Sequence, residues 1–173
     1  MTRRVIKAPR TMEGKDVYGF SVVKYPRTGV PIEVMALDAD GAQINNILPK
    51  FKVGEVVAVA QPYKDVIYTG GLPHPLVAKP GWTNKMFVRA DLMLHKIRIT
   101  NVRVERLQDI SDDDCLREGV QKEGPYAYYV HGKEDILGLS AKGVFSLLID
   151  RISGKETWMR NPWVFVYEFE LVK

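Results

Sequence analysis

The stretch from Leu94 to Gly119 reads LHKIRITNVRVERLQDISDDDCLREG, and it is the most informative part of the chain. Its first half alternates apolar residues with charged and polar ones, which predicts a half-buried strand with a basic outer face. The apolar phase shifts by one at Thr100 and Asn101, and this shift predicts a bulge or bend. The sequence therefore predicts one long strand whose two halves differ.

The second half of this stretch predicts a short helix. Ser111 is a favourable N-cap, and Asp114 stands at the capping-box position three residues later. The acidic run Asp112–Asp114 suits the positive end of the helix dipole. Gly119 follows the last helical turn, where glycine is favoured. These signals explain the acidic run through capping, without a bound cation.

The composition is that of one globular domain over residues 1–173, with 1–16 as a basic N-terminal arm. The chain is 46% hydrophobic and 27% charged, which is ordinary for a soluble domain. It has no apolar run long enough to span a membrane, and its basic N-terminus lacks the apolar core of a signal peptide. A cytoplasmic location follows as the expectation. With Cys115 as the single cysteine and three histidines at unrelated spacings, we expect no disulfide, metal site or cofactor.

Basic residues are concentrated in two blocks of a chain whose net charge is +4. Residues 1–30 hold seven Lys or Arg against two acidic residues, and residues 85–106 hold six against two. Such blocks are typical of a surface for an anionic polymer. The alternative is that they are solvated faces.

Further elements follow from periodicity and turn residues. We expect strands at 20–25 and 32–37 joined by the turn 26–29, a second turn at 38–41, a central strand at 56–60 and a closing strand at 163–172. A connector is expected at 45–51, a long loop at 64–84, and a strand or loop border at 85–90. A helix is expected at 140–152, with Gly154 as its stop. Its predicted buried face consists of Val144, Leu147, Leu148 and Ile152.

The closing strand should bury its aromatic face, formed by Trp163, Phe165, Tyr167, Phe169 and Leu171. Many short strands with Gly- and Pro-rich turns favour a barrel or sandwich. Two short helices late in the chain favour an α+β barrel of about five to seven mostly antiparallel strands.

Several segments resemble the ASCH domain superfamily, in particular its phage and prophage members. The similar segments are RITNVRVERLQDISDDDCLREGV (98–120), GKETWMRNPWVFVYEF (154–169), TRRVI (2–6), VGEV (53–56), and Pro80-Gly81-Trp82 followed by Met86 and Arg89. The resemblance as a whole extends over about two thirds of the chain and is strongest from Arg98 to the end. The resemblance implies a PUA-like fold and binding of RNA or a nucleotide.

Two departures from the family pattern bear on activity. Some small members of the superfamily are amidohydrolases that use a Lys and a carboxylate. The helix that carries a Lys before the TRRVI segment has no counterpart in this sequence. Ala60 and Gln61 stand where the family has an Arg-Glu pair. These departures separate the chain from the members with that activity, and no catalytic residue is assigned.

The predicted role is binding of RNA, single-stranded nucleic acid or a nucleotide in a basic cleft on the side of the barrel. Arginine and lysine would contact phosphate, Gln61 would bind a base edge, and two aromatic residues would stack. The predicted site consists of Arg3, Arg4, Gln61, Tyr63, Lys85, Arg89 and Trp158.

For several basic and aromatic residues a structural role is the alternative. Arg3 and Arg4 could form a disordered basic end, and Trp158 could cap the edge of the core. Trp82 and Phe87 are the aromatic residues near the cations of the long strand in the sequence. The cations on the outer face of the long strand, Lys96, Arg98 and Arg103, could pair with Glu168 and Glu170 instead of phosphate.

Two other functions stay open. A small hydrolase acting on a modified nucleoside or RNA would need a general base beside a charge stabiliser, and the candidates are Glu55, Asp65 and Lys85. A phage-derived protein-interaction module would be favoured if the aromatic segment 121–139 formed an exposed apolar patch.

Overall fold

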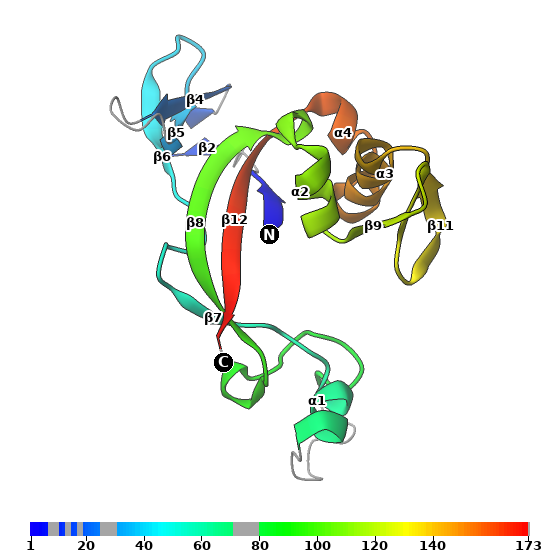
Figure 1. The fold of residues 1–173 in the computed structure, drawn as a ribbon. Helices are drawn as coiled ribbons and strands as arrows, with labels where there is room; N and C mark the ends of the chain where they lie inside the picture. Colours follow the sequence, from blue (N-terminus) through cyan, green and yellow to red (C-terminus); the bar gives the residue numbers. More distant parts are fainter. Residues whose placement is uncertain (7–10, 13–14, 17–18, 25–30, 71–79, 173) are drawn as a thin grey trace. The chain divides into compact units, whose positions relative to one another are not determined.

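The computed structural model describes residues 1–6, 11–12, 15–16, 19–24, 31–70 and 80–172 (Figure 1). These residues form antiparallel strand pairs and short helices, which confirms the α+β class; there are more strands than the five to seven expected. The chain divides into two compact units, unit 1 at residues 1–50 and 102–167 and unit 2 at residues 51–101 and 168–173. The closed PUA-like barrel and the single domain stay predictions.

The predicted long strand is confirmed as β8, Lys96–Arg106. Its buried residues are Ile99 and Val104, which are an odd number of positions apart. The boundary between the units falls between Asn101 and Val102, at the predicted shift of the apolar phase. The shift therefore marks where the strand leaves one unit and enters the other.

The first residues of the chain form a strand, so the prediction of an irregular arm is wrong for them. β1, Thr2–Val5, is antiparallel to β12, Trp163–Val172, which has the predicted bounds. Val164 and Val166 of β12 are fully buried in the core of unit 1. The expectation that the aromatic face seals the core is correct only in part, because Phe165 and Tyr167 are buried but Leu171 is exposed.

Both predicted helices are confirmed. α2, Asp112–Arg117, begins with Ser111 Oγ accepting the Asp114 N–H at 3.1 Å. α3, Ala141–Ser153, begins in the same way at Ser140 and ends at Gly154. The predicted buried face of α3 is wrong in half its members, since Leu147 and Ile152 are exposed. The buried face consists of Ala141, Val144, Phe145, Leu148 and Ile149.

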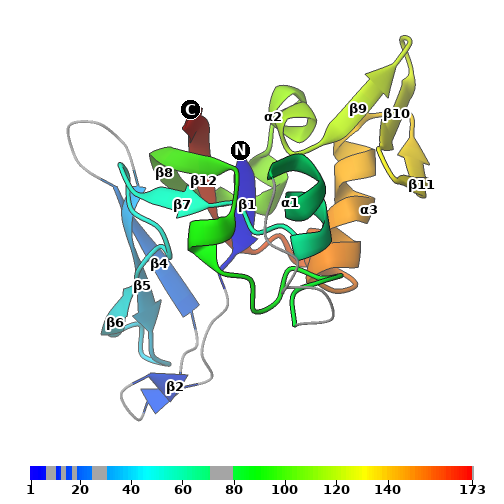
Figure 2. The ribbon, with the colours of Figure 1, turned by 90° about the horizontal axis from the view of Figure 1, so that it is seen from below.

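A sheet between these helices was not predicted. β9, Val120–Glu123, β10, Ala127–Val130, and β11, Lys133–Gly138, form an antiparallel sheet with β10 in the middle. α3 lies against this sheet (Figure 2), and the buried face of α3 shares one core with Val120 and Ile136. The short helix α4, Thr157–Arg160, follows α3 and precedes β12.

The other strands of unit 1 lie before residue 50. β4, Gly19–Lys24, pairs with β5, Pro31–Leu37, which confirms the predicted hairpin strands; their turn at 26–29 lies outside the described residues. The turn at 38–41 is confirmed, with Asp38 Oδ1 accepting two backbone N–H groups. The connector predicted at 45–51 is wrong over its first residues, because β6, Gln43–Ile47, pairs with β5. β2, Thr11–Met12, pairs with β3, Lys15–Asp16.

Unit 2 differs most from the sequence-based expectation. The predicted central strand is the short β7, Val56–Ala58, which lies at the end of the strand order and exposes Val56. A short apolar run does not by itself distinguish a central from an edge strand. α1, Tyr63–Gly70, occupies the start of the predicted long loop. Its sequence lacks proline and has Pro62 before it, a favourable helix start that the loop prediction overlooked.

Candidate functional site

The seven predicted site residues fall in different units. Unit 1 holds Arg3, Arg4 and Trp158, and unit 2 holds Gln61, Tyr63, Lys85 and Arg89. The two groups are therefore two separate sets of contacts.

Arg3 is buried in an ion cluster of unit 1. Its Nε donates to Glu105 Oε1 at 2.9 Å, its Nη2 to Asp114 Oδ2 at 2.9 Å and its Nη1 to Glu118 Oε1 at 3.0 Å. The register of β1 explains its position, because Arg3 lies opposite the core residue Val166. Arg4 points to the other face and is exposed.

The cluster joins three segments of unit 1, and in it two arginines face three carboxylates. Arg103 contacts Glu105 and Asp114, both at 3.1 Å. Burial disfavours the charged form of Arg3, but Glu105, Asp114 and Glu118 outweigh that cost and raise its pKa. Burial raises the pKa of Glu118, against the opposing charge of Arg3.

A phosphate contact by Arg3 would require breaking these bonds. The side chain of Arg3 is 1% exposed, and its N–H donors face carboxylates. The prediction of Arg3 as a phosphate contact is therefore wrong, and its role is structural.

Trp158 caps the edge of the core, as the structural alternative proposed. Its ring meets Phe145 edge-on, with centroids 6.2 Å apart. The segment after it is fixed by Asn161, which adopts a left-handed conformation with φ of 43°. Asn161 Oδ1 accepts the Gln108 N–H at 2.9 Å, and its carbonyl accepts from Arg106 at 3.1 Å. The W-x-x-N-P-W motif thus has a structural explanation in the link from α4 to β12.

In unit 2, Tyr63 holds a loop formed by residues 80–89, which we call the stacking loop. The Tyr63 hydroxyl accepts the backbone N–H of Arg89 at 2.9 Å, and the Tyr63 N–H donates to the Gly81 carbonyl at 2.9 Å. Tyr63 is 3% exposed, so its predicted role as a stacking platform is wrong. Gly81 has φ of 92°, and an added Cβ would lie 3.0 Å from the Tyr63 ring. The loop is therefore closely packed at its base.

The tip of the stacking loop presents an aromatic ring to solvent. Phe87 is 78% exposed and has φ of 63°, an outlier for a bulky residue. Lys85 and Met86 before it are also exposed. Arg89 is exposed and donates from Nε to Asp91 Oδ1 at 3.1 Å; this contact raises the pKa of Arg89. A ring held outward beside two cations has the chemistry of a stacking platform.

Gln61 has an acceptor without a partner. Its Oε1 is buried and accepts no hydrogen bond within the described part of the chain. Its backbone N–H donates to Met93 Sδ at 3.2 Å. Nothing in these contacts tests its predicted role in binding a base edge.

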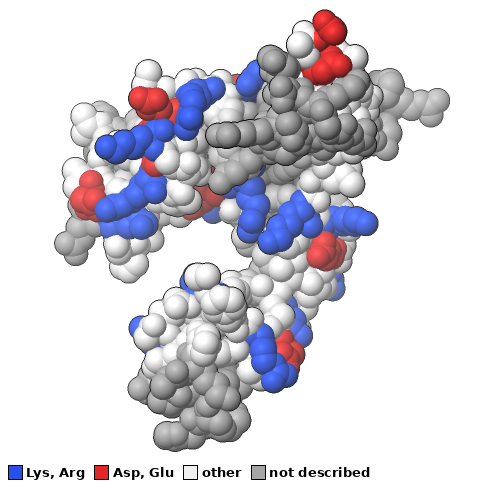
Figure 3. Space-filling model, turned by 180° about the vertical axis from the view of Figure 1, so that it is seen from behind, with Lys and Arg blue, Asp and Glu red and all other residues white. Residues whose placement is uncertain are grey.

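Of the cations on the outer face of β8, Arg98 makes the predicted pair with the last strand, whereas Arg103 pairs with other carboxylates. Arg98 Nη1 lies 3.1 Å from Glu170 Oε1 within unit 2, and Arg103 belongs to the Arg3 cluster. Figure 3 likewise shows basic side chains in small groups, with acidic side chains beside many of them. Basic content alone therefore does not locate a binding surface.

The single cysteine and the hydrolase candidates lie in different surroundings. Cys115 is fully buried, and burial raises the pKa of its thiol to about 11. Glu55, Asp65 and Lys85, the hydrolase candidates, are exposed. No group of three or more potential ligands from the described His, Cys, Asp and Glu residues is arranged to hold a metal ion. Within the described ranges, every helix is too short or too polar to cross a membrane.

Comparison of the chain with protein-family models, curated proteins and solved structures found no match. The site must therefore be judged on its own contacts. Sequence reasoning named Phe87 as a neighbouring aromatic residue but left it out of the site. The signal that could have found it is its place between Lys85 and Arg89, in a segment with no strand or helix periodicity.

Proposed function

We propose that the protein binds single-stranded nucleic acid through the stacking loop of unit 2. Phe87 stacks on a base, and Lys85 and Arg89 contact the adjacent phosphates. The observation that carries this proposal is the 78% exposure of Phe87 at the tip of a loop that is closely packed at its base.

The loop satisfies the physical requirements for such binding. An exposed phenyl ring gains little from water but stacks on any base, and such stacking contributes about 1–3 kcal/mol per base. The conformation of Phe87 is strained, and strained backbone concentrates at functional sites. Because Tyr63 and Gly81 fix the base of the loop, little conformational entropy is lost on binding. The ring is thus presented in advance of the ligand.

The charge of unit 2 supports an anionic ligand. Its sequence contains eight Lys or Arg and five Asp or Glu, whereas unit 1 contains 17 and 16. Unit 2 therefore carries most of the net positive charge in a third of the chain. The resemblance of the sequence to phage-type ASCH proteins of PUA-like fold supports RNA as the first ligand to test.

The test compares Phe87→Ala with Met86→Ala in titrations of a fluorescein-labelled uridine dodecamer at low salt, about 50 mM. Met86 is the matched control, because it is an exposed neighbour without an aromatic face. We expect Phe87→Ala to weaken binding by about tenfold and Met86→Ala by less than twofold. Lys85→Ala should reduce the slope of log K against log salt by about one. Equal losses in the two loop variants, or no binding at low salt, would refute the proposal.

A second candidate function, a protein-interaction module, is favoured by one observation in unit 1. Tyr126, Leu137 and Leu139 of the segment 121–139 are 74%, 65% and 83% exposed. Leu137 and Leu139 point away from α3, because the intervening Gly138 faces Val144. Sedimentation at rising protein concentration tests the simplest partner, a second copy. Association that Leu139→Asp abolishes would support this candidate, and a monomer at all concentrations would exclude self-association.

A further inference from the structure

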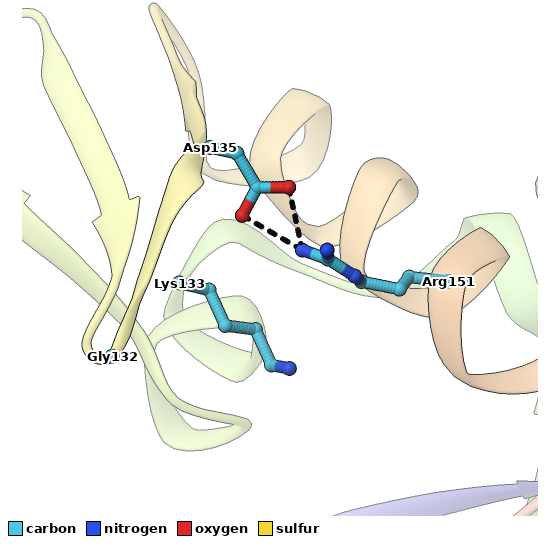
Figure 4. A pocket seen from close by; sticks show the side chains of 4 residues that line it. All are labelled: Gly132, Lys133, Asp135 and Arg151. Atoms are coloured by element: carbon cyan, nitrogen blue, oxygen red, sulfur yellow. Dashed lines mark hydrogen bonds and ion pairs between the residues drawn. The ribbon is translucent and has the colours of Figure 1, made fainter.

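A cavity of about 480 Å³ in unit 1 is lined by charged side chains from β11 and α3. Its lining residues are Gly132, Lys133, Asp135 and Arg151. Gly132 belongs to the turn between β10 and β11, where it has φ of 71° and no side chain to fill the opening. In Figure 4, Lys133 and Arg151 extend toward the same space from different elements.

Asp135 holds Arg151 in place but does not neutralise the cavity. Arg151 Nη1 contacts both carboxylate oxygens of Asp135, at 2.8 Å and 2.7 Å (Figure 4). These bonds use one terminal nitrogen of the guanidinium group. In the described part of the chain its Nε and Nη2 donate no hydrogen bond, and neither does Lys133 Nζ, although, beside the hydrogen bond from Arg151, the charge of Lys133 helps to lower the pKa of Asp135. The lining of the cavity therefore contains two cations, Lys133 and Arg151, and one carboxylate, Asp135, which leaves a net positive charge.

The donor set defines the ligand chemistry. The guanidinium fork matches the paired oxygens of phosphate or carboxylate, and lysine adds a point charge. Arg151 and Asp135 are 48% and 66% exposed, so their ion pair orients the guanidinium group but contributes little to stability. The cavity is open to solvent, so it suits the charged end of a ligand. An apolar ligand would find few apolar walls among these four residues.

We propose that this cavity binds the oxyanion group of a small molecule, with Arg151 and Lys133 as the contacting residues and Asp135 as the positioning residue. This site is independent of the proposed nucleic-acid function, because it lies in unit 1 and the stacking loop lies in unit 2. Either proposal can fail without the other.

The test is a titration of the full chain with inorganic phosphate and, separately, with acetate, at constant ionic strength. Two-dimensional ¹H–¹⁵N NMR follows the amides of Gly132 and Lys133 and the Nε–H of Arg151. We expect saturable shifts at these positions. If phosphate saturates at lower concentration than acetate, the ligand carries phosphate; the reverse order indicates a carboxylate.

Variants separate a site from general screening. Arg151→Met and Lys133→Met should each weaken binding about tenfold. Lys142→Met, an exposed lysine on the same helix, should leave binding unchanged. Arg151→Lys keeps the positive charge but lacks the paired N–H donors of the guanidinium group. It should weaken binding less than Arg151→Met, and it replaces Arg151→Met as the test variant if that protein does not fold. Shifts that do not saturate, or that persist in Arg151→Met and Lys133→Met, would overturn the proposal.

Discussion

The Arg3 cluster of unit 1 and the stacking loop of unit 2 use similar residues for opposite purposes. Arg3 is buried among three carboxylates, and its pKa is raised by them against the cost of burial. Lys85 and Arg89 are exposed beside an exposed ring. In the sequence both regions are basic blocks of similar density. The contacts, rather than the number of charges, distinguish a structural group from a binding group.

The difference arises from the position of each charge relative to the core. A buried charge is stable only with partners that replace its hydration. Arg3 therefore cannot bind a ligand without losing its bonds to Glu105, Asp114 and Glu118. An exposed charge keeps its water and gains little from a neighbour such as Asp91. Mutations in the two regions should therefore separate stability from binding.

The largest effect is expected for Arg3→Ala. Removing Arg3 leaves Glu105, Asp114 and Glu118 partly buried without their main partner, which should lower the free energy of unfolding by about 3–5 kcal/mol. Arg4→Ala is the matched control on the same strand, and its effect should stay within about 0.5 kcal/mol. Urea denaturation measures both. Equal effects of the two variants would remove the distinction between the buried and the exposed arginine.

A smaller effect on stability is expected for Gly81→Ala at the base of the stacking loop. The added Cβ would lie 3.0 Å from the Tyr63 ring and from Val88 Cγ1, in a backbone with positive φ. We expect a loss of about 2–3 kcal/mol from strain and overpacking together. Gly54→Ala is the control, since Gly54 has a similar φ of 86° but open space around it. Its loss should be about 1 kcal/mol, and a larger loss than that of Gly81→Ala would show that the loop base is not tightly packed.

The pH dependence of stability should report the burial of Cys115 in unit 1. Its folded-state pKa is raised to about 11 by desolvation, above its value in the unfolded chain. The raised pKa means that stability is complete below the unfolded pKa and is lost as pH rises through the folded value. Between pH 9 and 11 the wild type should lose about 2 kcal/mol more than Cys115→Ala. Parallel curves from denaturant titrations would indicate that the thiol titrates normally.

Local signals predicted much of the secondary structure. The helices α2 and α3 have side-chain caps at Ser111 and Ser140, which act within one turn of the backbone. β12 was predicted with its observed bounds because its pattern is long and regular. The phase shift in β8 predicts a bulge or bend, and in the structure it coincides with the boundary between the units.

Long-range contacts explain what the sequence did not predict. The burial and pairing of Arg3 depend on three carboxylates more than 100 residues away in the sequence, so no local sequence pattern predicts them. The burial of Tyr63 was likewise not predictable from its neighbours in the sequence. It comes from packing against Gly81 and Arg89, which follow much later in the chain. Phe87 was missed because exposure is a property of the folded loop. The residues of the candidate site could therefore be identified only from the structure, whereas the helices and the long strands could be predicted from the sequence.

The smallest effect is expected for Asp91→Asn in unit 2, and it sharpens the comparison most directly. Asp91 is exposed and holds Arg89 at a distance of 2.6 Å, and this contact lowers the pKa of Asp91. Losing an exposed ion pair should leave the unfolding midpoint unchanged. If the stacking loop binds RNA, releasing Arg89 and removing a negative charge should tighten binding about two- to threefold.

Glu55→Gln is the control for this variant, because it removes an exposed negative charge of unit 2 that contacts the Lys52 N–H instead of Arg89. Both variants are compared by anisotropy with the labelled uridine dodecamer. Tighter binding of the dodecamer by Asp91→Asn alone would indicate that Arg89 contacts the RNA. An equal gain in both variants would mean that binding responds only to the net charge of unit 2, and the loop would then lose its special role.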